Sequence, residues 1–254
     1  METFRYGAAA SQAGDLYLPK APRPPVVCLI HGGFWRLPYA RDQMGPLAEN
    51  LVRRGYAAWN LEYQRLGEDG GGWPGTLRDV SAGIDHLAVL NDKGADLDLT
   101  RVVTVGHSAG GHLALWAAGP RRLAAGDAAP KVKVMAAVGQ APAADINRVH
   151  ELKLSKGVAV EFLGGAPERF PERYALASPR ALLPLGVPQL VTHGDADDSV
   201  PVSIGRDYAK AARAAGDRCD YVEFPGVGHF EHLDPTGPTW AAVTDWLERL
   251  FRAA

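Results

Sequence analysis

The stretch VVTVGHSAGGHLAL, residues 102–115, joins a run of β-branched residues to a run of small and apolar ones. The first run favours a buried strand and the second a helix. Between them, residues 106–110 read G-H-S-A-G and fit the pattern G-x-S-x-G. Such a turn forces the serine into strained backbone angles, and its flanking glycines let strand and helix approach closely. We therefore predict that Ser108 is a catalytic nucleophile, the alternative being a plain strand–turn–helix crossover.

Outward from this stretch, short apolar runs alternate with longer amphipathic ones. The short runs predict strands that are covered on both faces, namely Val26–Ile30, Ala57–Tyr63, Arg101–Gly106, Lys131–Val138, Pro188–His193 and Cys219–Phe224. The longer segments predict helices over Asp42–Arg54, Leu77–Leu90, Ala109–Ala118, Val202–Ala215 and Thr239–Arg252. The alternation predicts an α/β fold with a mostly parallel sheet of about eight strands and helices on both faces. Phe4–Tyr6 and Asp15–Leu18 predict an antiparallel hairpin at the sheet edge.

One segment, residues 140–186, breaks the alternation. It holds prolines at 142, 167, 171, 179 and 184 and is longer than a crossover helix requires. We expect one α/β domain over residues 1–254, with 140–186 as a small helical cap insertion at the carboxyl end of the strands, above Ser108. There it would shape substrate choice. Simple padding is the alternative.

Composition narrows the function classes. The chain of 254 residues is 46% hydrophobic and 22% charged, with a formal net charge of −2, so we expect neither nucleic acid nor an anionic membrane as partner. Cys28 and Cys219 lie in apolar runs and predict buried free thiols of a reducing compartment. No Cys/His spacing suggests zinc, and we expect no metal and no organic cofactor. The first residues lack the pattern of a signal peptide and no run is long enough to span a membrane, so we expect a cytoplasmic protein. A homodimer is left open.

A serine hydroxyl needs a base to become nucleophilic at neutral pH. The stretch FPGVGHFEHLDP, residues 224–235, places His229 behind a glycine-containing loop between the last predicted strand and the last predicted helix. This loop belongs to the carboxyl edge of the sheet, where ligands bind in open α/β sheets. We predict His229 as the base, with His232 as the alternative.

The base in turn needs an acid that orients it and stabilises its charged form. The stretch PQLVTHGDADDSVP, residues 188–201, supplies three aspartates just after a predicted strand. We predict Asp197 as the acid, with Asp198 and Asp145 as alternatives. A merely solvated turn would also explain the three aspartates.

A further loop follows the first long strand in VVCLIHGGFWRLPYA, residues 26–40. Acyl transfer builds negative charge on a carbonyl oxygen, which backbone amides can stabilise where side chains leave room. Glycines at 32 and 33 provide that room. We predict the amides of Gly33, Phe34 and Ala109 as oxyanion donors. A simple glycine turn is the alternative.

HGGFW together with GHSAGGHLA resembles the HGG-type esterase branch of the α/β-hydrolases. The chain looks most like kynurenine formamidases (arylformamidases), whose H-G-G-x-W signature matches residues 31–35 position for position. Many hormone-sensitive-lipase-like esterases have a third glycine where this chain has Phe34. HGDADDSVP is also similar to prolyl-oligopeptidase catalytic domains, but those carry a large propeller for which this chain has no room. The resemblance implies the fold and a Ser108–Asp197–His229 triad, whose chain order is that of α/β-hydrolases.

The predicted function is a serine hydrolase of small carboxylic esters or N-formyl aryl amides that acts through an acyl-enzyme. The alternatives are a small peptidase or aminoacyl esterase, and a binding protein of this fold without turnover. We predict Trp35 and His107 as substrate-binding residues, with Trp73 and Tyr39 as further pocket aromatics. A core position for Trp35 is the alternative. Phe34 and Trp35 beside the donors predict a narrow acyl pocket that prefers formyl and acetyl groups.

Overall fold

The computed structural model describes residues 1–120 and 130–253. Eight strands form one sheet in the order β1-β2-β4-β3-β5-β6-β7-β8. The first two pairings, β1 with β2 and β2 with β4, are antiparallel, and the other five are parallel. The strands are β1 (Glu2–Arg5), β2 (Ala13–Tyr17), β3 (Pro25–Ile30), β4 (Ala57–Leu61), β5 (Asp98–His107), β6 (Ala136–Gln140), β7 (Gln189–Gly194) and β8 (Cys219–Phe224). This architecture confirms the predicted fold class and the edge hairpin.

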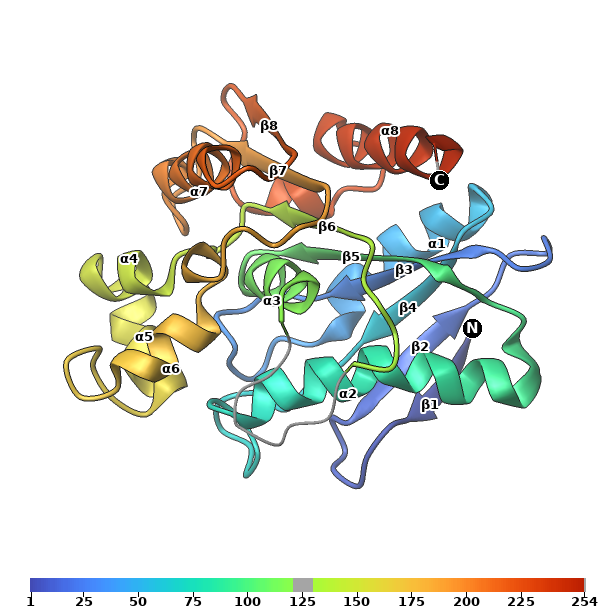
Figure 1. The fold of residues 1–254 in the computed structure, drawn as a ribbon, viewed down its shortest axis with the longest axis horizontal. Coiled ribbons are helices and arrows are strands. Elements are labelled where there is room, and N and C mark those ends of the chain that lie inside the picture. Colours follow the sequence, from blue (N-terminus) through green and yellow to red (C-terminus); the bar gives the residue numbers. More distant parts are fainter. Residues whose placement is uncertain (121–129, 254) are drawn as a thin grey trace.

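Helices cover both faces of the sheet (Figure 1). The α-helices are α1 (Gly45–Arg53), α2 (Gly75–Leu90), α3 (Ala109–Ala118), α4 (Ile146–Glu151), α5 (Leu154–Leu163), α6 (Pro171–Ala177), α7 (Val202–Ala214) and α8 (Pro238–Ala253). Shorter helical turns are η1 (Arg41–Met44), η2 (Asn91–Ala95), η3 (Pro179–Ala181) and η4 (Phe230–Leu233). None of the helices in the described ranges is both long and apolar enough to cross a membrane.

The strand β3 shows how the layers are built. All six of its residues are buried, and successive side chains point to opposite faces of the sheet. Val26, Cys28 and Ile30 belong to one core cluster with α2 and α3. Val27 and Leu29 belong to another with α1 and α8. An uninterrupted apolar strand therefore stabilises both faces at once.

One predicted strand begins later than the sequence pattern indicates. The pattern predicts a strand from Lys131, but β6 starts at Ala136. The amides of Lys131 and Val132 donate instead to the side chain of Asp85 on α2, at 3.1 and 3.0 Å. The first ladder contact is the amide of Met135 with Val102, at 2.8 Å. The amides of Lys131 and Val132 thus bind a side chain of α2 and are not available for strand pairing.

Candidate active site

Ser108 lies at the turn between β5 and α3, with φ 57° and ψ −120°. Left-handed φ values are costly for a side-chain-bearing residue, and such strain gathers at functional sites. The turn is so tight that a Cβ on Gly106 would lie 2.0 Å from the carbonyl oxygen of Gly110. A Cβ on Gly110 would lie 2.0 Å from the carbonyl oxygen of Ile30. The two glycines therefore let α3 pack directly against the ends of β3 and β5.

His229 and Asp197 form a buried pair at the ends of two neighbouring strands. Nδ1 of His229 lies 2.7 Å from Oδ2 of Asp197. The other carboxylate oxygen, Oδ1, accepts the amides of Ser199 and Val200 at 2.9 and 2.8 Å. Burial works to raise the pKa of Asp197, but the contacts from His193 and His229 outweigh it and hold that pKa far below its usual value. Asp197 is therefore a carboxylate that fixes the orientation of the His229 ring.

The alternative acids and the alternative base lie elsewhere. Asp198 accepts from the hydroxyl of Ser199 at an exposed position, at 3.0 Å. Asp145 caps α4 by accepting the amide of Arg148, at 3.2 Å. His232 is fully buried, and its Nδ1 lies 3.4 Å from the hydroxyl of Thr192.

A second histidine contacts Asp197 and was missed by the sequence analysis. Nε2 of His193 lies 3.2 Å from Oδ2 of Asp197 and 2.9 Å from the carbonyl oxygen of Val200. Both groups are acceptors, so this nitrogen carries the hydrogen. The sequence did offer a signal for this role. His193 is the first residue of HGDAD, at the end of a predicted strand and four residues before Asp197. His193 thus adds a second imidazole contact to the carboxylate, and its own side chain is fully buried.

Ser108 and His229 line the same cavity, which has a volume of about 120 Å³. The lining residues are Gly33, Phe34, Tyr39, Gln43, His107, Ser108, Ser199, His229 and Phe230. Within the described ranges, the Ser108 hydroxyl makes no hydrogen bond to His229. Contacts of this kind often tighten only when substrate binds. A larger hollow of about 270 Å³ between Tyr17 and Arg53 holds no pair of nucleophile and base.

Two residues that line this cavity, Gly33 and Phe34, and Ala109 next to Ser108 have backbone amides without partners among the described residues. The amides of Gly33, Phe34 and Ala109 donate no hydrogen bond to any residue that the structure describes. Gly33 and Phe34 have φ values of 103° and 49°, which turn the loop sharply after β3. Ala109 is the first residue of α3, where amides are unpaired and the helix dipole favours negative charge. These groups can serve an anionic oxygen.

Trp35 does not reach the cavity. Its side chain is fully buried, stacks on Phe162 at a centroid distance of 4.6 Å, and donates from Nε1 to Nδ1 of His112 at 3.2 Å. The predicted pocket role of Trp35 is thus corrected in favour of the core alternative. Trp73 also packs against this core rather than lining the cavity.

His107 lines the cavity, as does the predicted aromatic Tyr39. Burial lowers the pKa of His107 well below its ordinary value, and the nearby His229 and His232 lower it further. The ring is therefore neutral. Its Nε2 donates to the carbonyl oxygen of His229 at 2.9 Å, which leaves Nδ1 as an unpartnered acceptor.

The segment 140–186 packs against the HGGFW loop and the residue after it. Figure 1 shows α4, α5 and α6 grouped together at the left of the view, beside the start of α3. Phe162 of α5 stacks on Trp35, and the Arg36 guanidinium donates to the Ser155 carbonyl at 3.1 Å. None of the residues that line the cavity comes from this segment. It supports the loop from the core side instead of covering Ser108.

No group of three or more His, Cys, Asp or Glu side chains among residues 1–120 and 130–253 is arranged to hold a metal ion. A serine hydroxyl, an imidazole–carboxylate pair and unpaired amides in this arrangement are able to support acyl transfer.

Comparison with known proteins places this geometry in a family. The BD-FAE family model matches residues 15–211. The chain belongs to the BD-FAE family. Among curated proteins, kynurenine formamidase from Danio rerio is 25% identical over 235 residues, which cover 90% of this chain and 74% of that protein.

Solved structures give the same fold for this BD-FAE member. Apo esterase 2 from Thermogutta terrifontis is 25% identical, with a TM-score of 0.77 over 98% of this chain and 91% of that one. A bifunctional GH43-CE protein from Bacteroides eggerthii reaches a TM-score of 0.82 at 24% identity. It covers 97% of this chain, which spans 37% of that longer protein. The BD-FAE chain is an esterase-like hydrolase of the α/β-hydrolase type.

Proposed function

We propose that this protein is a serine carboxylesterase that removes compact acyl groups from aryl esters and N-formyl aryl amides, with a preference for formyl and acetyl groups. The observation that carries the proposal is the buried Asp197–His229 pair, which opens onto the small cavity that also holds Ser108. In this mechanism Ser108 attacks the acyl carbon as His229 takes its proton. His229 then returns the proton to the leaving group, and water hydrolyses the acyl-enzyme by the same route.

The cavity volume supports a compact acyl group. About 120 Å³ is less than the roughly 150 Å³ of an engineered cavity that accommodates benzene. A formyl or acetyl group fits this volume, whereas an octanoyl chain exceeds it. The unpaired amides of Gly33, Phe34 and Ala109 would stabilise the negative oxygen of the tetrahedral intermediate.

The mouth of the cavity supports an aromatic leaving group. Phe230 and Tyr39 line the cavity with 62% and 45% of their surfaces exposed. Exposed rings beside a reacting centre offer flat apolar surfaces, where a ring contact adds about 0.5–1.5 kcal/mol. The likeness to a kynurenine formamidase and to esterases agrees with an aryl amine or aryl alcohol as the leaving group.

Hydrolysis of p-nitrophenyl acetate by wild type and by Ser108→Ala tests the proposal. We expect the variant to lose at least a thousandfold in kcat with an unchanged melting temperature. Ser203→Ala is a matched control that removes a hydroxyl outside the cavity. A fluorophosphonate probe should label wild type and Ser203→Ala but not Ser108→Ala. Absence of both labelling and turnover in wild type would favour a binding protein instead.

The acyl and leaving groups are resolved by comparing p-nitrophenyl acetate, p-nitrophenyl octanoate, N-formylkynurenine and an aminoacyl arylamide. We expect kcat/KM to be highest for the acetyl or formyl substrates. A preference for the aminoacyl arylamide would support the peptidase alternative, and a preference for octanoate would contradict the narrow cavity.

A further inference from the structure

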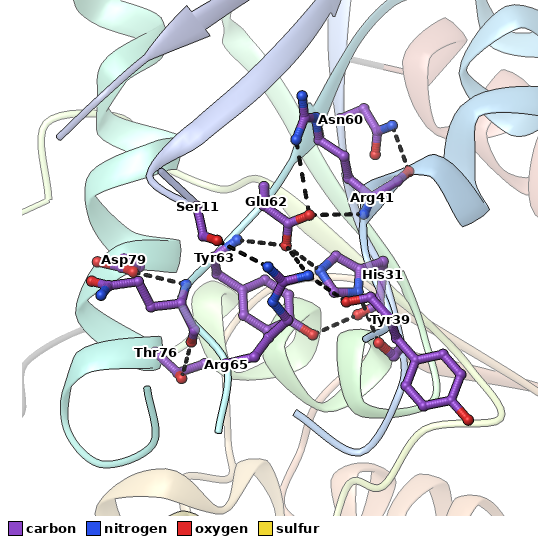
Figure 2. A network of polar contacts seen from close by, with 12 residues as sticks. Ser11, His31, Tyr39, Arg41, Asn60, Glu62, Tyr63, Arg65, Thr76 and Asp79 are labelled. Carbon is purple, nitrogen blue, oxygen red and sulfur yellow. Dashed lines mark hydrogen bonds and ion pairs between the residues drawn. The ribbon is translucent and has the colours of Figure 1, made fainter. Parts of the chain in front are cut away.

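His31, the first residue of the HGGFW loop, faces two acceptors with its ring. Its Nε2 lies 2.7 Å from Oε1 of Glu62, and its Nδ1 lies 2.8 Å from the carbonyl oxygen of Gly32. Figure 2 shows the ring beside the Glu62 carboxylate. A neutral imidazole has one donor nitrogen, and its other nitrogen would then face an acceptor lone pair at close range. Both contacts are satisfied only when both nitrogens carry hydrogen.

The proton belongs to the ring and not to the carboxyl group. Glu62 is almost fully buried, and its oxygens accept the amides of Arg41 at 3.0 Å and Tyr63 at 3.1 Å. The guanidinium of Arg65 lies 3.5 Å from Oε1. Burial works to raise the pKa of Glu62, but the hydrogen bond and charge of His31 outweigh it and lower that pKa. Glu62 is therefore ionised, and the two acceptors that face the His31 ring call for a hydrogen on each of its nitrogens.

The charged groups around this pair balance one another. Arg41 pairs with Asp15 at 2.7 Å and Arg65 with Glu68 at 2.9 Å. With His31 and Glu62, the cluster holds three cations and three carboxylates.

Tyrosines complete the surroundings of the pair. The ring of Tyr63 stacks on His31 at 4.3 Å, and its hydroxyl donates to the His31 carbonyl at 2.9 Å. The hydroxyl of Tyr6 donates to the carbonyl of Glu62 at 2.7 Å. The remaining carboxylate in Figure 2, Asp79, is bound by Gln12 at 2.7 Å and by the amide of Gln64 at 3.0 Å.

The acceptor on Nδ1 links this pair to the cavity. The Gly32 carbonyl and the Gly33 amide belong to one trans peptide, in which C=O and N–H point in opposite directions. The carbonyl points to the His31 ring, so the Gly33 amide points away from it. Gly33 lines the cavity with Ser108. A charged donor on one side of a peptide polarises it and strengthens the donor on its other side.

We propose that Glu62 and His31 form a charged positioning pair behind the oxyanion hole, in which imidazolium His31 orients and polarises the Gly32–Gly33 peptide so that the Gly33 amide becomes a stronger donor. The inference rests on the proposed function because it assumes an anionic oxygen at that amide. The effect grows as charge develops on the substrate oxygen, so the pair acts on kcat and leaves KM nearly unchanged.

The protonation state of His31 is measured directly by ¹⁵N NMR of the imidazole rings in the wild-type protein at the pH of the kinetic assay, with His31→Gln for assignment. We expect two protonated ring nitrogens for His31. One protonated and one unprotonated nitrogen would overturn the inference. This measurement needs no substrate, so it stands whether or not the proposed function holds.

The kinetic test uses Glu62→Gln with Asp15→Asn as the matched control. Either orientation of the introduced side-chain amide leaves the His31 ring neutral, so the Gly32 contact is lost or reduced to a weaker neutral bond. We expect kcat for p-nitrophenyl acetate to fall about 10- to 100-fold at unchanged KM, less than the about 10²- to 10³-fold loss from removing an entire donor. Asp15→Asn changes a carboxylate of the same cluster that does not touch His31, and should keep kcat within about twofold.

Three outcomes separate this inference from the proposed function. A wild-type kcat retained by Glu62→Gln, while Ser108→Ala is inactive, would refute the positioning pair alone. An equal loss in Glu62→Gln and Asp15→Asn would reduce the effect to general stability, and would also refute it. A wild-type protein without turnover would refute the proposed function. The NMR measurement alone would then test whether both nitrogens of His31 are protonated.

Discussion

Asp197 combines two properties at the residue scale: its pKa is held far below the ordinary value, and its Oδ2 lies 2.7 Å from His229. It is therefore ionised at neutral pH. Asp197→Asn keeps the shape but can donate to Nδ1 and so favours the wrong tautomer of His229. We expect kcat for p-nitrophenyl acetate to fall by about 10³- to 10⁴-fold.

Asp198→Asn is the matched control, since that exposed side chain accepts a hydrogen bond from the Ser199 hydroxyl and does not contact His229. It should retain kcat within about twofold. A severe loss in Asp198→Asn together with an active Asp197→Asn would assign the acid to the wrong aspartate.

Two neighbouring aromatics allow a second test at this scale. Phe34 lines the cavity, whereas Trp35 is a core residue. Phe34→Ala should widen the acyl side and raise the ratio of octanoate to acetate turnover by about tenfold or more. Trp35→Phe should leave that ratio unchanged and lower the free energy of unfolding by about 1–3 kcal/mol, because it loses ring volume and the bond to His112. Acyl-chain-length profiles and urea unfolding of both variants test this pair of expectations. A changed chain-length profile in Trp35→Phe would show that the Trp35 ring contacts the acyl group.

The same residues show what a sequence pattern can predict about a site. The motif G-x-S-x-G is local, and the strained φ of Ser108 and the close approach at Gly106 follow from it. The orientation of Trp35 depends on left-handed backbone angles at positions 34 and 35, which no local pattern indicated. The contact of His193 with Asp197 depends on how the loop after β7 folds back on its strand. The catalytic roles of Ser108, Asp197 and His229 stay predictions until activity is measured.

At the scale of elements, the crossing of β3, β5 and α3 decides whether the site can form. A Cβ on Gly110 would lie 2.0 Å from the carbonyl oxygen of Ile30 and 2.4 Å from that of His31. Neither backbone atom can move without shifting β3. We therefore expect Gly110→Ala to lower the free energy of unfolding by about 3 kcal/mol or more, or to prevent folding.

Gly45, the first residue of α1, is the matched control. It has helical angles of φ −53° and ψ −51°, and beyond its chain neighbours and its own helix backbone no atom of the described residues lies within 4 Å of an added Cβ. Gly45→Ala should raise the free energy of unfolding by about 0.4–1 kcal/mol by restricting the unfolded chain. Urea unfolding of both variants tests the pair, and equal effects would show that the crossing is looser than its geometry implies.

Strands that are buried on both faces were predictable because they require a nearly continuous run of apolar residues, as in β3. The late start of β6 was not predictable, since it depends on hydrogen bonds from two amides to Asp85, which lies 46 and 47 positions earlier in the chain. The position of 140–186 was predicted at the carboxyl end of the sheet, but its contact with Trp35 arises only from packing.

At the scale of the whole molecule, buried neutral histidines set the response to acid. Burial is the largest cause that lowers the pKa of His112 to about 4 and that of His232 to about 3, and it lowers the pKa of His107 well below its ordinary value. In the unfolded chain a histidine has a pKa of about 6.5. Below that pH the unfolded state takes up protons that the folded state refuses, so stability is present above about pH 6.5 and is lost as the pH falls toward 4.

The variant His232→Phe isolates one of these groups. Among the described residues, the His232 side chain makes one long hydrogen-bond contact, 3.4 Å to Thr192, and its Nε2 has no partner. Phenylalanine therefore forfeits little hydrogen bonding. Removing one proton site should reduce the slope of the unfolding free energy against pH by about 1.4 kcal/mol per pH unit between roughly pH 6 and 4.5. The carboxylates with lowered pKa values, among them Asp197 and Glu62, act in the same direction but below about pH 4.5, where unfolded carboxyl groups take up protons. Urea unfolding at half-unit pH intervals separates the two windows, and a slope in His232→Phe equal to that of wild type would mean that His232 is already protonated in the folded protein.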